Sequence, residues 1–342
     1  MALTPIFIRS YGAVSPAGWG VEPLMKVLRT GEPLPAQSLV APTGDRPRRV
    51  LTVPAPAVRP AALGHPRLRR ASVISQFAVA AAAEARQRCA VQSGQEPRLG
   101  VVTGTHGASI RYSERFFGEV LRDPATASPL LFPETVTNAP ASHLAAFLGG
   151  APLTYSLIGD QTVFVQALLV ATDWLLERQV DLCLVVSAEE TAWMIADAVQ
   201  RFGHSIVSSE GAGALVLARE AGNNPGILLE RITDAHIYAG HVTKEAAAHA
   251  MRKDFPGHGP KELLVDARCG VPRVDRAETA AWQDWPGPRL SPRAVLGEGL
   301  SAATAWQCVA ACAALADGRA DAANVSVVGA NQQAIGVRFV RV

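Results

Sequence analysis

The stretch SSEGAGALVLARE (208–220) decides the fold of this chain. Small residues lead into an apolar run, and this pattern predicts a buried β-strand. The segment ILLERITDAHIYAG (227–240) follows and predicts a strand next to it. Upstream, VDLCLVVSAEE (180–190) predicts a strand that is apolar on both faces. Continuous apolar strands separated by helices indicate a sheet that is covered on both sides.

Strand-like and helix-like segments alternate on both sides of this stretch, which predicts an α/β fold. Similar strand–helix units recur in both halves of the chain, so we expect an internal duplication. The region 31–70 is rich in proline and arginine and predicts an irregular surface excursion. The remaining expected strands are 5–14, 99–105, 153–159, 261–267, 324–331 and 334–342, and the expected helices are 21–31, 71–91, 110–123, 141–149, 161–179, 243–255 and 300–317.

The composition limits the possible functions. Hydrophobic residues make up 49% of the chain, enough for a large core and against intrinsic disorder. Charged residues make up only 18%, which indicates that part of the surface is covered by a partner protein. The net charge is +2 and no basic stripe is present, which argues against a nucleic-acid partner.

The cysteines and the N-terminal segment bear on where in the cell the chain is expected. The five cysteines are an odd number and lack metal-ligand spacing, so we expect neither a disulfide framework nor a metal site. No cofactor-binding motif is present, and we expect no cofactor. No signal peptide and no apolar run of membrane-spanning length are found, so we expect a cytoplasmic protein without a membrane span.

Several segments, in order along the chain, resemble the β-ketoacyl synthase family of the thiolase fold. They are YGAVSPAGWGVEPLMKVLRTGEP (11–33), VVTGTHGA (101–108), FPETVTNAPASHLAAFLGG (132–150), SSEGAGALVLARE (208–220) and TDAHIYAGHVTKEAAAHAMRKDF (233–255). The resemblance implies a thiolase-like α/β fold of two duplicated halves, each with a mixed sheet, layered α-β-α-β-α. It divides the chain into 1–220 and 221–342, with the insertion at about 31–70 and a helical cap at about 108–150.

Active members of the family use a cysteine and two histidines. The cysteine lies where a strand turns sharply into a helix, and it carries the acyl group as a thioester. Here that turn is LIGDQT (157–162), and the nucleophile position falls on Gln161, or on Asp160 if the count shifts by one. The two histidine positions fall at or near Arg268 and on Glu298. The family's lysine is replaced by Arg293, and its closing glycine-rich loop survives as VVGANQQ (327–333), which contains Asn331.

These replacements predict a degenerate site. A primary amide has no low-pKa form and cannot form a thioester, and an arginine does not exchange protons at neutral pH. If Arg268 and Glu298 both face the old cavity, we expect them to form an ion pair that fills it. Asp266 is in position to support Arg268. Cys269 is a conceivable replacement nucleophile, but its loop position favours an ordinary cysteine.

Family members with glutamine in place of the cysteine resemble chain length factors, which pair with an active ketosynthase in polyketide, aryl-polyene or fatty-acid-type biosynthesis. The resemblance therefore implies a ketosynthase partner in a heterodimer, or a second copy in a homodimer, and an acyl carrier protein as a further partner. The expected interface involves the helical segment around 129–148 and the strand following LTYSLIG (153–159). The alternatives are a glutamine-type malonyl-carrier-protein decarboxylase, another acyltransferase, or a homodimeric carrier-protein-binding scaffold.

Overall fold

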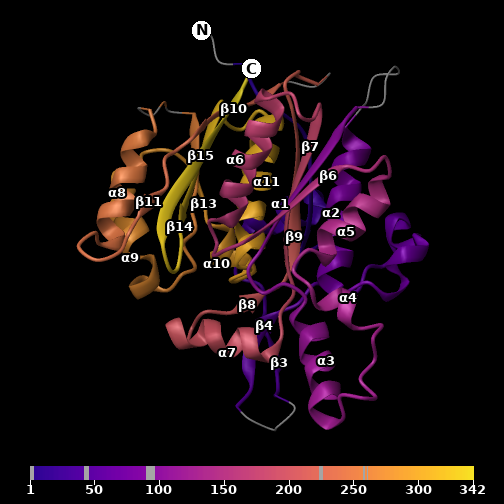
Figure 1. Ribbon diagram of the computed structural model, residues 1–342. Helices are drawn as coiled ribbons and strands as arrows, with labels where there is room; N and C mark the ends of the chain where they lie inside the picture. Colours follow the sequence, from indigo (N-terminus) through magenta and orange to yellow (C-terminus); the bar gives the residue numbers. More distant parts are fainter. Residues whose placement is uncertain (1–3, 42–45, 90–96, 223–225, 257–258, 260) are drawn as a thin grey trace.

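The computed structural model describes residues 4–41, 46–89, 97–222, 226–256, 259 and 261–342. These residues form one twelve-stranded mixed sheet with two wings, and a small three-stranded sheet (Figure 1). In spatial order, the first wing holds β6 (Leu153–Ile158), β5 (Leu99–Thr105), β7 (Leu182–Glu189), β9 (Gly211–Ala218) and β1 (Phe7–Ser15). The second wing holds β10 (Ile227–Ile232), β15 (Gln333–Arg341), β14 (Ala322–Val328), β12 (Glu262–Val265) and β13 (Arg289–Leu290). Two short strands, β2 (Gly18–Trp19) and β11 (His236–Ile237), pair with β1 and β15.

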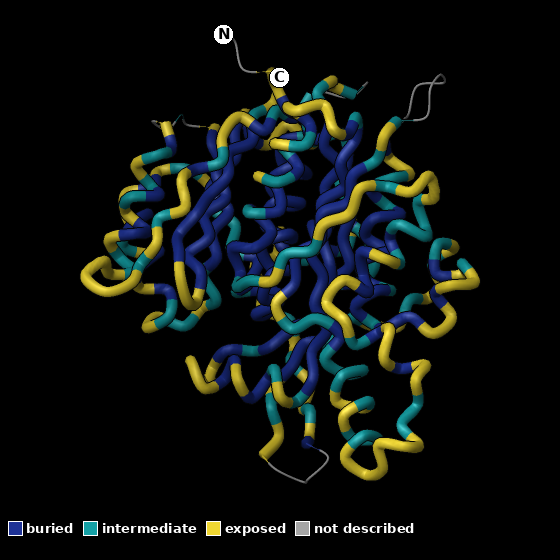
Figure 2. The backbone as a smooth tube through the Cα atoms, viewed as in Figure 1, coloured by how far each residue is buried: buried dark blue, intermediate teal, exposed yellow. Residues whose placement is uncertain are grey.

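Two helices fill the space between the wings. The helix α11 (Ser301–Ala316) contacts strands of both wings, and every residue from Ser301 to Leu315 is buried (Figure 2). The helix α6 (Val163–Leu176) lies beside α11 and packs mainly on β5 and β7. The mixed α-β-α-β-α layering expected from the sequence is confirmed, because further helices cover the outer faces. These are α2 (Val73–Arg88) and α5 (Ala139–Leu148) on the first wing, and α8 (Lys244–Asp254) and α9 (Pro272–Ala281) on the second; α1 (Val21–Thr30) packs on β1 and α11.

The strand β9 forms at the stretch 208–220, as predicted, and it pairs with β7 and β1. Gly213 is required there, because a Cβ atom at this position would lie 2.6 Å from the Cβ of Ala305 on α11. The prediction that β9 and β10 are neighbours is wrong, since β1 lies between them and pairs antiparallel with both. Strand periodicity identifies a buried strand but does not reveal which partner lies at each edge, and β1 is apolar enough to lie inside the sheet.

The region 31–70 is more regular than predicted. The strands β3 (Gln37–Leu39) and β4 (Arg48–Leu51) form the small sheet together with β8 (Ser208–Ser209), while residues 42–45 lie outside the described residues. Two 3₁₀ turns follow, at Ala61–Gly64 and Pro66–Arg70. Short edge pairings of this kind depend on a distant partner, here β8, and local sequence does not signal them.

The insertion positions a helix below the main sheet. The helix α7 (Trp193–Phe202) packs on β4, and the Arg48 guanidinium bonds the Asp197 carboxylate through Nε at 2.9 Å. The Gln200 amide donates to the Arg49 carbonyl at 3.1 Å. These contacts fix α7 as one wall of the cavity described below.

The region 108–150, where a helical cap is expected, contains three helices. They are α3 (Ile110–Arg122), α4 (Phe132–Thr135) and α5, and α3 has no buried residue. His143 lies in the first half of α5, where its Nε2 is 2.6 Å from a Glu134 carboxylate oxygen. This contact braces α4 against α5 and gives His143 a structural role.

Candidate functional site

A cavity of about 280 Å³ lies where β6, β12 and β14 reach their carboxyl ends. Side chains from the β6–α6 turn, the β14–β15 loop, α7, α8, α9 and the connection between α10 (Pro292–Leu296) and α11 line it. Five of the six residues that the sequence analysis singled out line this cavity: Asp160, Gln161, Arg293, Glu298 and Asn331. The sixth, Arg268, does not belong to the wall as far as the described residues define it.

Gln161 lies at the strand–helix turn, two residues before α6 begins, as predicted. Its side chain is buried, with 4% of its surface exposed, and its Oε1 accepts a hydrogen bond of 3.0 Å from the Ala330 backbone N–H. Its carbonyl oxygen accepts one of 2.6 Å from the Thr304 hydroxyl of α11. The amide therefore links the turn to the β14–β15 loop.

Asp160 strengthens the same link. Its Oδ1 accepts hydrogen bonds from the Thr162 backbone N–H at 3.0 Å and from the Thr162 hydroxyl at 2.6 Å. Its Oδ2 accepts one of 3.2 Å from the Asn331 backbone N–H. Gly329 makes this approach possible, because a Cβ atom there would collide with the Asp160 carboxylate. The carboxylate thus caps the turn and is compensated by N–H groups.

Arg293 and Glu298 form a buried ion pair in the cavity wall. The Arg293 guanidinium also donates to the Ala267 carbonyl at 2.5 Å, and Glu298 accepts from the Leu300 backbone N–H at 2.8 Å. Burial alone would lower the pKa of Arg293, but the Glu298 carboxylate beside it raises that pKa above its ordinary value. Both charges are therefore retained and neutralise each other.

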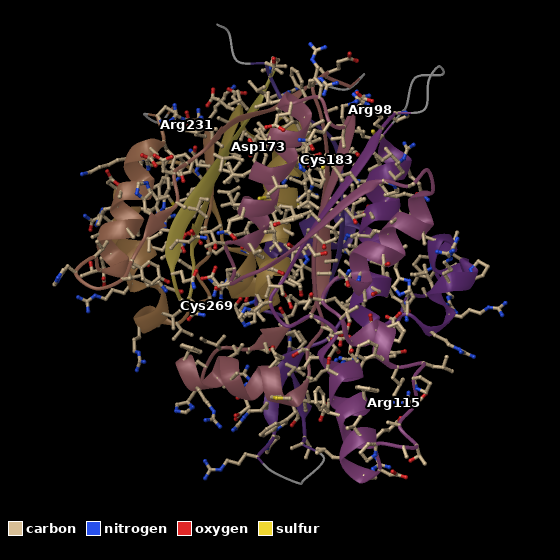
Figure 3. All side chains as sticks on the ribbon, in the orientation of Figure 1. Arg98, Arg115, Asp173, Cys183, Arg231 and Cys269 are labelled. Atoms are coloured by element: carbon tan, nitrogen blue, oxygen red, sulfur yellow. The ribbon has the colours of Figure 1, made fainter. Side chains whose placement is uncertain are left out.

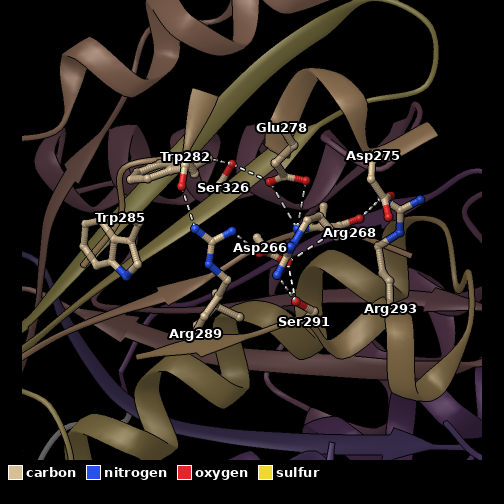
Figure 4. A network of polar contacts seen from close by, with 12 residues as sticks. Asp266, Arg268, Asp275, Glu278, Trp282, Trp285, Arg289, Ser291, Arg293 and Ser326 are labelled. Atoms are coloured by element: carbon tan, nitrogen blue, oxygen red, sulfur yellow. Dashed lines mark hydrogen bonds and ion pairs between the residues drawn. The ribbon is translucent and has the colours of Figure 1, made fainter. Parts of the chain in front are cut away.

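The expected ion pair between Arg268 and Glu298 is wrong. Arg268 instead bonds the fully buried Asp266 carboxylate, with Nε to Oδ2 at 2.7 Å (Figure 4). The support that Asp266 was expected to give Arg268 is thus observed. The physical reason is that successive residues after β12 face opposite ways. Ala267 lines the cavity, so the next residue, Arg268, points away from it. Ser291 and Arg289 complete the cluster around Asp266, at 2.6 and 3.5 Å.

The same region holds a carboxyl group whose neutral form is favoured by burial. Glu278 on α9 accepts from the Ala267 backbone N–H at 3.1 Å and lies 2.5 Å from the Ser326 hydroxyl (Figure 4). Burial, followed by the nearby Asp266 charge, raises the pKa of Glu278 to about 8. The group lines the cavity, where its neutral form adds no negative charge.

None of the five cysteines has an activated thiol environment. Cys89, Cys183, Cys308 and Cys312 are buried, and burial raises the pKa of the last three well above the ordinary value. Cys269 lies in the loop after β12, away from the strand–helix turn, and its thiol is 3.3 Å from the Asp275 carboxylate (Figure 3). Burial raises the pKa of Cys269 to about 11, so it remains a thiol at neutral pH.

The sequence analysis missed two parts of the wall. Lys244, the first residue of α8, lines the cavity, and so do Ile195, Val199 and Phe202 of α7. In the sequence Lys244 follows the helix-capping Thr243 and has the pattern of a solvated first-turn residue. Only the packing of α8 across the mouth of the cavity distinguishes it.

The available groups restrict the chemistry of the site. In the described residues, the cavity wall contains no cysteine, serine or threonine, and its one histidine is His106. The His106 Nδ1 is already 2.9 Å from the Gly159 carbonyl oxygen. No cluster of potential metal ligands occurs among the residues the structure describes. Across those same residues, none of the helices combines the length and apolarity that a bilayer span requires.

Comparison with solved structures identifies the fold as that of the thiolase-like ketosynthases. The ishigamide ketosynthase/chain length factor is 24% identical with a TM-score of 0.79, and the match covers 99% of both chains. A ketosynthase in complex with its chain length factor from Xenorhabdus doucetiae is 17% identical with a TM-score of 0.78, over 99% of this chain and 98% of that one. A type II polyketide ketosynthase in complex with its acyl-carrier protein is 13% identical with a TM-score of 0.79, over 99% of both chains. No protein-family model matches the chain, and no curated protein sequence does.

Proposed function

We propose that this chain is a non-condensing, chain-length-factor-like subunit that pairs with an active ketosynthase in polyketide, aryl-polyene or fatty-acid-type biosynthesis. The observation that carries the proposal is Gln161 at the strand–helix turn. Its amide has no nucleophilic form, and its oxygen already accepts from the Ala330 N–H. A condensing enzyme needs a group there that forms a thioester.

The replaced acid–base positions support the same proposal. Glu298 and Arg293 neutralise each other, and Arg268 is engaged with Asp266 outside the wall. Neither Glu298 nor Arg268 supplies the histidine donor that would stabilise a developing enolate, so this arrangement opposes the chemistry of a condensing site. We propose that these residues brace a vestigial site.

The edge strand β6 is the surface we propose for the partner. In the described part of the chain β6 pairs only with β5, and three of its apolar side chains are well exposed: Leu153 by 44%, Tyr155 by 51% and Ile158 by 61%. In Figure 2 the backbone of this strand has the colours of exposed and intermediate residues. An uncovered apolar edge strand promotes pairing with another chain. We propose a ketosynthase as the partner at this edge and an acyl carrier protein as a further partner; the similar solved structures include a ketosynthase in complex with its chain length factor and a ketosynthase in complex with an acyl-carrier protein.

Co-expression with an active ketosynthase tests the proposal. We expect a stable one-to-one complex whose condensing activity needs the partner's cysteine and survives Gln161→Ala in this chain. Ile158→Asp should break the complex, because it places a charge on the edge strand, whereas Ile237→Asp, on the exposed β11, should leave it intact. Condensation by this chain alone, or a complex indifferent to Ile158→Asp, would contradict the proposal.

A further inference from the structure

We propose that the cavity at the strand–helix turn is a binding site for a small, free amphipathic carboxylic acid, whose carboxylate is held by the Lys244 amine. This inference goes beyond the proposed subunit role and does not depend on it. It assigns a ligand class to a cavity that has lost its nucleophile.

The Lys244 amine takes part in no ion pair in the described part of the chain, although the Glu278, Asp160 and Glu298 carboxylates attract it from farther away. Among the described residues, no hydrogen bond or ion pair to its amine is found, and its one charge–ring contact places Nζ 5.8 Å from the centre of the Tyr238 ring. Burial, followed by the charge of Arg293, lowers the pKa of Lys244. A half-buried ammonium in this state gains a compensating interaction when an anion enters.

The carboxylates of the wall leave Lys244 available, because each of them is compensated by another group. Glu298 pairs with Arg293, and Glu245 lies 3.6 Å from Arg276. Asp275 accepts from two backbone N–H groups at 2.9 Å, and Asp160 from the N–H groups described above. Burial raises the pKa of Glu278, which favours its neutral form. An incoming carboxylate therefore meets the Lys244 amine, which lies in no ion pair among the described residues, and the exposed Arg273, which also lines the cavity.

A second donor in the wall lacks a partner. The side chain of Arg293 is only 6% exposed, and its Nε has no hydrogen-bond acceptor in the part of the chain that the structure describes. Buried N–H groups without an acceptor are costly, and a bound oxygen atom or water removes that cost.

The other side of the cavity is apolar. Ile195, Val199, Phe202, Ile206 and Leu300 line it, so the ligand must carry a hydrocarbon body opposite its charged end. The volume of about 280 Å³ corresponds to roughly nine water molecules in liquid water. A carboxylic acid of about eight carbons matches this space, and octanoate is the probe that we choose.

Calorimetric titration of the purified chain with octanoate tests the site. We expect saturable one-to-one binding of octanoate. Octanol and the octanoyl thioester of N-acetylcysteamine lack the carboxylate charge, so they should bind at least about tenfold more weakly. Lys244→Met should weaken octanoate by at least about tenfold, and Lys244→Arg should restore much of the affinity. The matched control is Lys253→Met, an exposed lysine of the same helix, which should bind octanoate like the unchanged chain.

Equal binding of octanoate and octanol, or undiminished octanoate binding by Lys244→Met, would overturn the proposal, as would the absence of binding at millimolar octanoate. The comparison of octanoate with octanol uses the unchanged chain, so it tests the need for a charged ligand even if Lys244→Met fails to fold. Because no ketosynthase is present, failure here leaves the proposed subunit role to its own test.

Discussion

Separating the Arg293–Glu298 pair should destabilise the fold far more than removing both charges. Arg293→Met leaves the Glu298 carboxylate, with 3% of its side chain exposed, without its counter-ion. It also leaves the Ala267 carbonyl without a donor. Breaking a buried pair on one side costs about 3–5 kcal/mol of unfolding free energy, because an uncompensated charge stays buried.

The double variant Arg293→Met/Glu298→Gln removes both charges and keeps an acceptor for the Leu300 N–H. We expect it to be more stable than Arg293→Met by about 2 kcal/mol or more, since replacing a buried pair by neutral groups is often nearly neutral. Urea unfolding of the unchanged chain, the two single variants and the double variant, at one fixed protein concentration, gives the coupling free energy between Arg293 and Glu298.

The exposed pair Arg29–Asp317, with 47% and 45% of the two side chains exposed, provides the control. Arg29→Met should cost at most about 1 kcal/mol. Additive costs for Arg293→Met and Glu298→Gln would refute the reasoning, because additivity means that the two charges do not compensate each other.

Three further predictions follow from the site and its surroundings. Burial raises the pKa of Glu278 from 4.5 to about 8, so its contribution to the unfolding free energy is present below about pH 4.5 and is lost as the pH rises through 8. Glu278→Gln should therefore flatten the decline of the unfolding free energy between about pH 5 and 8. An unchanged slope would contradict this. Gln161→Cys alone should not create a condensing enzyme, because the two expected histidine positions still hold Arg268 and Glu298. Malonyl-carrier-protein decarboxylation within tenfold of an active ketosynthase would show the site to be competent. Gly213→Ala should lower the midpoint of urea unfolding, because its Cβ would lie 2.6 Å from that of Ala305, whereas the open Gly118→Ala should not.

Much of the fold is predictable because its strands are long, apolar and separated by periodic helices. The strand–helix turn at Gln161 is predictable for the same reason, since β6 and α6 flank it with strong patterns. The neighbour of β9 is not, because periodicity carries no information about which strand pairs at a buried edge. The pairing of β3 and β4 with β8 likewise depends on contact between distant segments.

The side-chain partners of the site are predictable only in part. Arg293 lies five residues before Glu298 on α10, whereas Arg268 lies in the loop after β12, and the sequence does not show which of the two arginines pairs with Glu298. The structure places Ala267 at the wall, which turns Arg268 toward Asp266. Lys244 carries no sequence signal at all, because its role depends on where α8 packs.

The central claim is that this chain cannot hold an acyl group as a thioester, and intact-mass spectrometry tests it most directly. The purified chain is incubated with an acyl-carrier-protein thioester, beside an active ketosynthase as the positive control. We predict an unchanged mass, because Gln161 occupies the turn and the five cysteines lie elsewhere, four of them buried. A stoichiometric acyl adduct on any cysteine of this chain would contradict the account.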